Sequence, residues 1–493
     1  MIFNSVSYLL FFPVVVLFYF VLPYKWRNVW LLIVSYYFYM NWNAKYALLL
    51  AGSTLITFLC SLVVDRCRQR GKMGLAKAAL AASFVLNLGI LAVFKYSGFV
   101  ADNINRLMGA LHQDVRVSGF SVILPVGISF YIFQALGYTM DVYRGRIPAT
   151  GNLLRYALFV SFFPQLVAGP IERSENLFPQ FEEKHDFDTD RVRSGLLTIL
   201  WGLFMKIVIA DNLSGIVTNV YDHYLAYTGV EILLATVLFA FQIYCDFGGY
   251  SYIAIGSARV LGFSLMDNFR APYLAVSVND FWKRWHISLT GWFRDYLYIP
   301  LGGNRRGKLR KYCNMMIVFL VSGLWHGADW SFVIWGGLNG LYLVLSQVFA
   351  PLFSSVKQKC KVKEEGLSYR LFAGFCTFVL IDFSWMFFRA DSISAVYAML
   401  RQVKANFGFH MLFGGAVSAW GLDMPTLLAL AAGFVLLFVV DQSIYRNRDL
   451  NAFILSQGPF LRYSVYLGLL ILILFFGVYG YEYAQTAFIY FQF

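Results

Sequence analysis

Long apolar runs separated by short polar stretches occupy most of this chain of 493 residues. Runs of about 20 apolar residues can cross the hydrocarbon core of a bilayer as a helix. Hydrophobic residues make up 59% of the chain and charged residues only 14%, which is more apolar surface than a soluble domain of this length needs. Helices satisfy their own backbone hydrogen bonds inside lipid. The sequence therefore predicts an all-α polytopic membrane protein.

The apolar runs predict about 11 to 13 spans or half-spans in one membrane domain over residues 1–493. We expect these segments near residues 6–22, 29–41, 46–64, 78–99, 120–138, 194–210, 231–262, 315–325, 331–349, 371–388, 427–441 and 463–480. The segment 231–262 is too long for one span, and Gly248-Gly249 is the predicted break. The run 156–170 is short and contains two prolines, which favours a re-entrant loop that does not cross.

Basic residues give the chain a formal net charge of +13 and occur in short clusters between the apolar runs. Such clusters are typical of cytoplasmic loops. Three of them, at residues 25–27, 65–77 and 141–146, fall on the same predicted side when the spans are counted. This distribution indicates membrane topology rather than a nucleic-acid groove, for which the sequence has no motif.

Two histidines lie in the stretch from Asn279 to Asn339, and His326 is the stronger functional candidate. It stands between the apolar runs 315–325 and 330–337. An ionisable residue in such a place is functional by default, because burying it is costly. Neutral imidazole is well suited to take a proton from a hydroxyl near pH 7. Gly323 and Gly327 are expected to leave room for a substrate beside the ring.

The other histidine, His286, is predicted on the apolar face of an interfacial helix that begins after a cap at Asn279. The residues that share this face are Trp282, His286, Leu289 and Phe293. Two interpretations stay open. His286 is either a structural histidine that hydrogen-bonds a neighbouring carbonyl or a second polar group that lines a reaction chamber.

The chain contains several long motifs that are typical of one protein family. They are FWKRWHISLTGWFRDYLYIPLGGNR, VSGLWHGADWSFVIWG, LPVGISFYIFQALGYTMDVYRG, FVSFFPQLVAGPIERSENLFPQF, FQIYCDFGGYSYIAIGSARVLGF and the terminal FIYFQF. Together they resemble the membrane-bound O-acyltransferases, specifically the bacterial branch with the alginate O-acetyltransferase membrane subunit. The resemblance implies a multi-helix membrane fold in which His326 is catalytic and His286 is the second signature polar position. The chain departs from the family pattern at Tyr252, where an acidic residue is frequent, and at Asn339, where a histidine is frequent.

The resemblance also implies the reaction and its setting. An acetyl group would pass from a cytoplasmic donor, acetyl-CoA, to an exported or cell-wall polysaccharide such as alginate. The protein would lie in the bacterial inner membrane and work with an extracytoplasmic acetyltransferase or esterase-like partner. Relatives pass D-alanine to teichoic acid or acetate to peptidoglycan, and the motifs leave these acceptors open. No bound cofactor, metal or nucleic acid is expected.

Cations near His286 are candidate contacts for the donor's phosphates, since charge-assisted hydrogen bonds hold phosphate strongly. These candidates are Lys283, Arg284 and Arg294, and the alternative is that they only orient the chain in the membrane. A membrane transporter or flippase is the competing function. A break at Gly248-Gly249 together with Pro164 and the intramembrane Asp246 would form its substrate site. A third interpretation is a scaffold that only anchors an extracellular enzyme.

Overall fold

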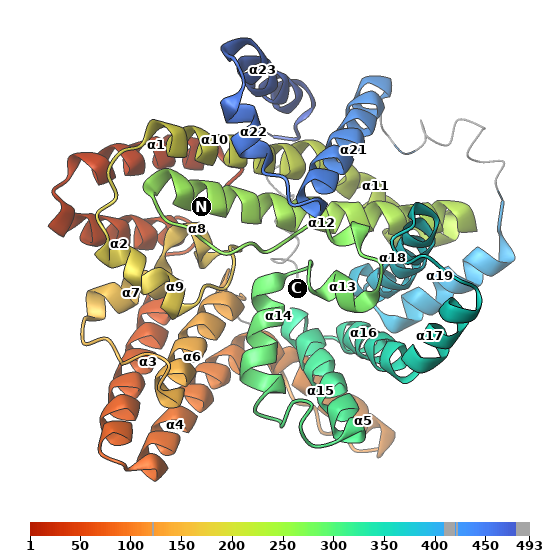
Figure 1. The fold of residues 1–493 in the computed structure, drawn as a ribbon. Coiled ribbons are helices and arrows are strands. Elements are labelled where there is room, and N and C mark those ends of the chain that lie inside the picture. The colour runs from red at the N-terminus through yellow and green to blue at the C-terminus, as the bar shows by residue number, and fades with distance from the viewer. Residues whose placement is uncertain (121–122, 409–419, 421–422, 480–493) are drawn as a thin grey trace. The chain divides into compact units, whose positions relative to one another are not determined.

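The computed structural model describes residues 1–120, 123–408, 420 and 423–479, and every regular element within them is a helix (Figure 1). Eight helices in this part of the chain are long and apolar enough to cross a membrane. They confirm the predicted class, an all-α polytopic membrane protein. The terminal motif FIYFQF and residue 480 of the last predicted span lie outside the described residues.

Contacts divide the chain into two compact units. The first comprises Met1–Leu196 and Ile253–Met266, and the second comprises Leu197–Tyr252 and Asp267–Phe493. The prediction of one domain over residues 1–493 stays a prediction, because two compact units can belong to one domain. Two helices have residues in both units, α10 (Thr189–Leu203) and α12 (Gly229–Leu261).

The other helices of the first unit are α1 (Val6–Val21), α2 (Tyr24–Met40), α3 (Lys45–Gln69), α4 (Met73–Leu91), η1 (Ala92–Tyr96), α5 (Ser97–Ala110), α6 (Ile128–Arg144), α7 (Leu153–Ser161), α8 (Phe163–Leu166) and α9 (Ser174–Glu182). Those of the second unit are η2 (Phe204–Ala210), α11 (Asp211–Asp222), η3 (Tyr224–Ala226), η4 (Pro272–Leu274), α13 (Val278–Trp282), α14 (Ile287–Phe293), η5 (Arg294–Tyr298), α15 (Lys308–His326), α16 (Trp330–Val348), α17 (Ala350–Lys359), α18 (Leu367–Arg389), α19 (Ile393–Ala405), α21 (Met424–Tyr445), α22 (Leu450–Ser456) and α23 (Pro459–Phe476).

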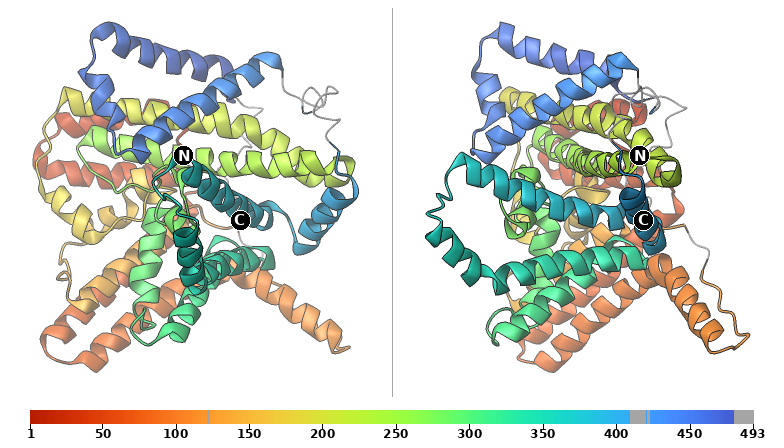
Figure 2. Two further views of the ribbon diagram at one scale, coloured as in Figure 1. Left: turned by 45° about the vertical axis from the view of Figure 1, so that its right-hand side comes forward. Right: turned by 90° about the vertical axis from the view of Figure 1, so that its right-hand side faces the viewer.

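In the first unit, α3, α4 and α6 pack against one another, and they are drawn in shades of orange (Figure 1 and Figure 2). The buried hydroxyl of Tyr156 on α7 donates to Thr57 on α3 over 2.7 Å. With nine and four residues, α7 and α8 are far too short to span a bilayer. Their length agrees with the prediction that the segment 156–170 does not cross.

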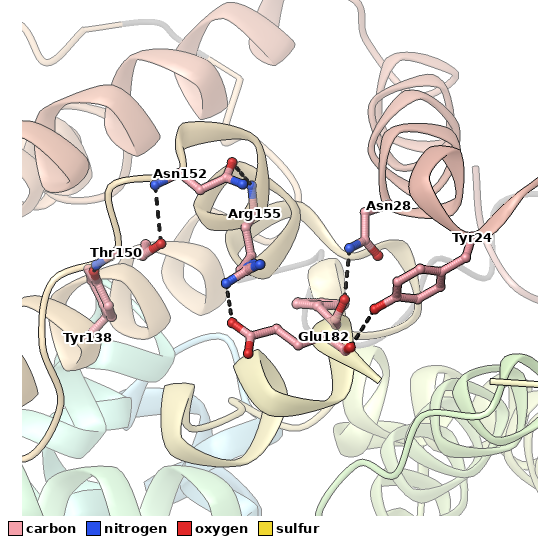
Figure 3. A network of polar contacts seen from close by, with 8 residues as sticks. Tyr24, Asn28, Tyr138, Thr150, Asn152, Arg155 and Glu182 are labelled. Carbon is pink, nitrogen blue, oxygen red and sulfur yellow. Dashed lines mark hydrogen bonds and ion pairs between the residues drawn. The ribbon is translucent and has the colours of Figure 1, made fainter. Parts of the chain in front are cut away.

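A polar network joins α2, α7 and α9 in the first unit (Figure 3). Asn152 caps α7, its side-chain oxygen accepting from the Arg155 amide over 3.1 Å. The Arg155 guanidinium pairs with the Glu182 carboxylate, and the Tyr24 hydroxyl donates to the Glu182 carbonyl. Asn28 donates to the α9 backbone over 2.8 Å. These contacts hold the short helices in place without requiring α7 to span the membrane.

The helix α12 is uninterrupted over its 33 residues, so the predicted break at Gly248-Gly249 is wrong. The glycines serve close packing instead. A Cβ on Gly249 would lie 2.7 Å from the carbonyl oxygen of Gly202 on α10 and 3.1 Å from the amide of Lys206. Glycine costs a helix only about 1 kcal/mol relative to alanine, which close packing can offset. The helix therefore continues through both glycines.

Candidate active site

The hairpin of α15 and α16 places His326 at the end of its first helix. Glycines on both helices bring the two backbones together. A Cβ on Gly323 would lie 2.2 Å from the carbonyl oxygen of Phe332, and a Cβ on Gly336 would lie 2.2 Å from that of Phe319. Asp329 caps α16, because its carboxylate accepts a backbone N–H of the first turn over 2.7 Å. Side chains larger than hydrogen at these glycines would force the hairpin apart.

The prediction that Gly323 and Gly327 leave room for a substrate is therefore wrong. A Cβ on Gly327 would lie 2.1 Å from a ring carbon of Phe332, so the neighbouring helix occupies this space as well. Van der Waals contact between the two helices, rather than access to the imidazole, requires glycine at both positions. The missing side chains still matter for the site, because they set the position of His326.

His326 is buried, with only 3% of its surface exposed. Its ring centroid lies 4.9 Å from that of Trp325, 4.9 Å from that of Trp335 and 5.4 Å from that of Phe388. Aromatic rings on several sides exclude water and restrict the orientation of the imidazole. Electrostatic interactions are stronger in such surroundings than in water. The residue thus has the setting expected of a base that acts on a bound substrate.

His286 does not lie on a continuous helix, so the predicted helical face is wrong. Ser277, not Asn279, caps α13, with its hydroxyl accepting from the Asp280 amide over 3.1 Å. This helix ends at Trp282, and α14 begins only at Ile287. His286 itself is left-handed, with φ of +44°. Its burial is nevertheless as predicted, because the break turns the ring into the unit and leaves the side chain 1% exposed.

The structure brings the two predicted histidines together across 40 residues of sequence. Their ring centroids are 6.4 Å apart, with an interplanar angle of 63°. The ring of Trp325 contacts both imidazoles, at centroid distances of 6.0 Å from His286 and 4.9 Å from His326. Burial lowers the pKa of His286 to about 3, so this imidazole is neutral at physiological pH. Two imidazoles this close, at least one of them neutral, can act together on one bound hydroxyl group.

Asn268 is a site residue that the sequence analysis missed. Its side-chain oxygen lies 3.1 Å from Nδ1 of His286. This amide is 1% exposed and stands in the loop between α12 and η4, 18 residues before the histidine. No helical or strand periodicity relates the two positions, so only the folded loop identifies the contact. The structural interpretation of His286 expected a neighbouring carbonyl as partner, and the structure shows the side-chain amide oxygen of Asn268 at that place.

Two buried polar atoms on α16 have no hydrogen-bond partner among the residues that the structure describes, namely Nε1 of Trp335 and Oδ1 of Asn339. The Asn339 amide nitrogen donates to the Trp335 carbonyl over 2.9 Å and to the Ser384 hydroxyl over 3.2 Å. A carbonyl only accepts, so this contact identifies the nitrogen and the oxygen of the amide. Buried polar atoms are nearly always paired with protein, water or ligand. Water or a bound molecule can pair with these two atoms.

Two of the three cations predicted to contact the acetyl donor are paired with carboxylates. Arg284 pairs with Asp280 over 2.9 Å, and its guanidinium lies 4.7 Å from the ring centroid of Tyr445. Arg294 pairs with its neighbour Asp295 over 2.9 Å and has a side chain that is 67% exposed. Lys283 is exposed. A role for these cations in binding phosphates stays a prediction.

Asp246, which the transporter interpretation uses, belongs to a buried ion cluster. The Lys206 ammonium lies 2.6 Å from the Asp246 carboxylate and 2.7 Å from that of Asp211, and all three side chains are at most 4% exposed. Buried charges of this kind need partners, and here one cation serves two anions. With α12 unbroken and Asp246 paired, the broken-helix carrier site loses its structural basis. Among the described residues, no three His, Cys, Asp or Glu side chains form a group that could hold a metal ion.

Comparison with known proteins relates both histidines to one family. Residues 146–372 match the model of the MBOAT, membrane-bound O-acyltransferase family. A probable alginate O-acetylase of Pseudomonas putida is 36% identical over 449 residues, which cover 91% of this chain and 89% of that protein. A peptidoglycan O-acetyltransferase of Helicobacter pylori is 34% identical over 422 residues, 79% of this chain and 77% of that protein.

A more distant relative, a teichoic acid D-alanyltransferase of Streptococcus thermophilus, is 26% identical over 312 residues. These residues cover 56% of this chain and 72% of that protein. The matched family region contains both histidines, Asn268 and the whole of the α15–α16 hairpin.

Proposed function

Since the chain belongs to the membrane-bound O-acyltransferase family, we propose that it acetylates an exported or cell-wall polysaccharide with acetyl-CoA from the cytoplasm as donor. Relatives at 34% to 36% identity are named for alginate and for peptidoglycan acetylation, which supports acetate over D-alanine as the transferred group. One observation carries the assignment of the site. Two buried imidazoles from distant parts of the sequence lie with centroids 6.4 Å apart inside the family region.

His326 is the proposed general base. It accepts the proton of the acceptor hydroxyl, or of a group that relays the acetyl, while the hydroxyl oxygen attacks the thioester carbonyl. A C–O bond forms, the C–S bond breaks, and the imidazolium returns the proton to the leaving thiolate. General acid–base assistance of this kind contributes about 10² to 10⁴ in rate. The products are an acetyl ester and free coenzyme A, so the step balances without any further reactant.

His286 is proposed to act as a neutral hydrogen-bonding group beside the base. Its lowered pKa keeps it uncharged at the pH of the cytoplasm. A second positive charge next to the imidazolium of His326 would oppose proton transfer, whereas a neutral ring does not. Lys283 is the best placed of the three candidate phosphate contacts, because Arg284 and Arg294 already pair with carboxylates.

We also propose that the protein lies in the inner membrane of a bacterium and delivers acetate to an extracytoplasmic acetyltransferase or esterase-like partner. Eight candidate spans among the described residues support a multi-pass membrane protein. The basic loops support a cytoplasmic entrance for the donor.

The test is transfer of isotope from [acetyl-¹⁴C]acetyl-CoA in membranes that contain the chain. Wild-type protein should label the acceptor polymer or the partner, and His326→Ala should reduce this label about 10²-fold or more. His223→Ala is the matched control, because that histidine is exposed and lies outside the site. No label with wild type would favour a carrier. Full label with His326→Ala in correctly inserted protein would favour a scaffold.

A further inference from the structure

The oxygen of the Asn268 side chain accepts from more than one group. It lies 3.1 Å from Nδ1 of His286, 2.9 Å from the hydroxyl of Ser288 and 3.4 Å from the backbone amide of Ser288. The backbone carbonyl of Asn268 also accepts from the amide of Ile287 over 3.0 Å. The side-chain nitrogen donates to the hydroxyl of Ser251 over 3.2 Å. One buried residue therefore contacts His286 and the first two residues of α14 and links them to Ser251 on α12.

The identity of the atom that faces His286 follows from these donors. Nitrogen and oxygen of an asparagine amide are normally assigned from their hydrogen bonds. A backbone N–H can only donate, so the atom opposite the amide of Ser288 is oxygen. The same oxygen forms the contact with Nδ1 of His286. Because an amide oxygen carries no proton, Nδ1 must be the protonated donor of this hydrogen bond.

A neutral imidazole has one N–H, so the proton on Nδ1 leaves the lone pair on Nε2. Rings that pack on His286 in the described part of the chain include Phe247, Phe269, Trp325 and the titratable His326. His286 has a left-handed backbone conformation, which residues other than glycine rarely adopt. Strained backbone at a site is retained when its geometry has a use.

We propose that Asn268 is a positioning residue, which holds His286 in the tautomer that presents Nε2 as a hydrogen-bond acceptor beside His326. The inference rests on the proposed function. In that reaction, Nε2 of His286 accepts a hydrogen bond from a neighbouring hydroxyl of the acceptor, and the reacting hydroxyl keeps its one proton for His326. Asn268 itself touches no reacting atom.

Double-mutant cycles on the full chain in membranes test this role. Asn268→Leu removes the accepting oxygen and should lower kcat about 10- to 100-fold, as loss of an orienting partner commonly does. His286→Gln keeps an amide near the position of Nε2, and His286→Asn keeps one near Nδ1. We expect His286→Gln to retain more activity than His286→Asn. In the His286→Gln background, Asn268→Leu should then cost less than twofold.

If Asn268 were only structural, Asn268→Leu would lower kcat by the same factor in wild type and in the His286→Gln variant. Equal losses would therefore overturn the proposal. Ser288→Ala is the matched control, because it removes one donor to the same oxygen and leaves the contact with His286. It should keep activity within a few-fold of wild type. Loss equal to that of Asn268→Leu would also overturn the proposal.

Asn268→Asp supplies a second readout should the leucine variant fail to fold. The Asp carboxylate, which accepts the hydrogen bond from Nδ1, stabilises the imidazolium and so raises the pKa of His286 from about 3. Below the raised pKa, Nε2 carries a proton and can no longer accept. Acetyl transfer by Asn268→Asp should therefore fall as pH decreases from 8 to 5 more steeply than that of wild type. Parallel profiles would refute the tautomer argument, whereas an inactive wild type would refute the proposed function instead.

Discussion

Replacing Gly336 by alanine should separate α15 from α16 and disable the site. The new Cβ would lie 2.2 Å from the carbonyl oxygen of Phe319, and ordinary contact begins at 3.4 Å. The helices must open by about 1.2 Å, because a backbone carbonyl cannot rotate away as a side chain can. Overpacking costs about 1 to 3 kcal/mol. The better helix propensity of alanine returns only about 1 kcal/mol.

Gly337→Ala is the matched control on the next residue. Its Cβ would meet only Leu320, a flexible side chain, at 3.5 Å. We expect this variant to be as stable as wild type or more stable by up to about 1 kcal/mol. Because both variants gain the same helix propensity, they should differ by about the overpacking cost, about 1 to 3 kcal/mol in the free energy of unfolding.

The assays are thermal unfolding in one detergent and acetyl transfer in membranes. Displacing His326 by about 1 Å can cost about 10² in rate, so activity should fall for Gly336→Ala and not for Gly337→Ala. Equal stability and equal activity of the two variants would refute the argument that backbone contact between the helices positions the histidine.

Two further predictions concern the second unit. Lys206→Met leaves two buried carboxylates without their cation and should lower stability by about 3 to 5 kcal/mol. Adding Asp211→Asn and Asp246→Asn should recover most of the loss, and an unchanged unfolding midpoint in the single variant would contradict the prediction. Trp335→Phe keeps an aromatic ring against His326 but removes the indole N–H. Measured kcat should fall about 10²-fold if this N–H stabilises the thioester oxygen, and unchanged kcat would exclude that role.

Periodicity and run length predicted the helices well. Each apolar run expected to span or half-span contains a helix, although in the run 120–138 the helix α6 begins only at Ile128. The physical reason is local, because a backbone in lipid must satisfy its hydrogen bonds within its own segment. The prediction of a helix break at Gly248-Gly249 failed because the outcome there is not local. Whether a glycine pair breaks a helix depends on the neighbour that approaches it, and here α10 fills the space.

Residue type and flanking sequence identified both histidines as candidates, and the structure brings the two rings together, but their geometry was not predictable. A regular helix from Asn279 would have carried His286 on one face, whereas the fold breaks the helix and turns this residue left-handed. Asn268 had no detectable signal, since an asparagine in a loop is usually a turn residue. Its contact with His286 depends on how two loops pair.

Hydropathy and run length predict a helical membrane protein with two unusual imidazoles, because both act on each segment independently. The folded chain adds that these imidazoles lie with centroids 6.4 Å apart and that an amide oxygen faces Nδ1 of one of them. Such contacts depend on backbone approach at glycines and on loop conformation. Both are properties of pairs of distant segments, which no single stretch of sequence specifies.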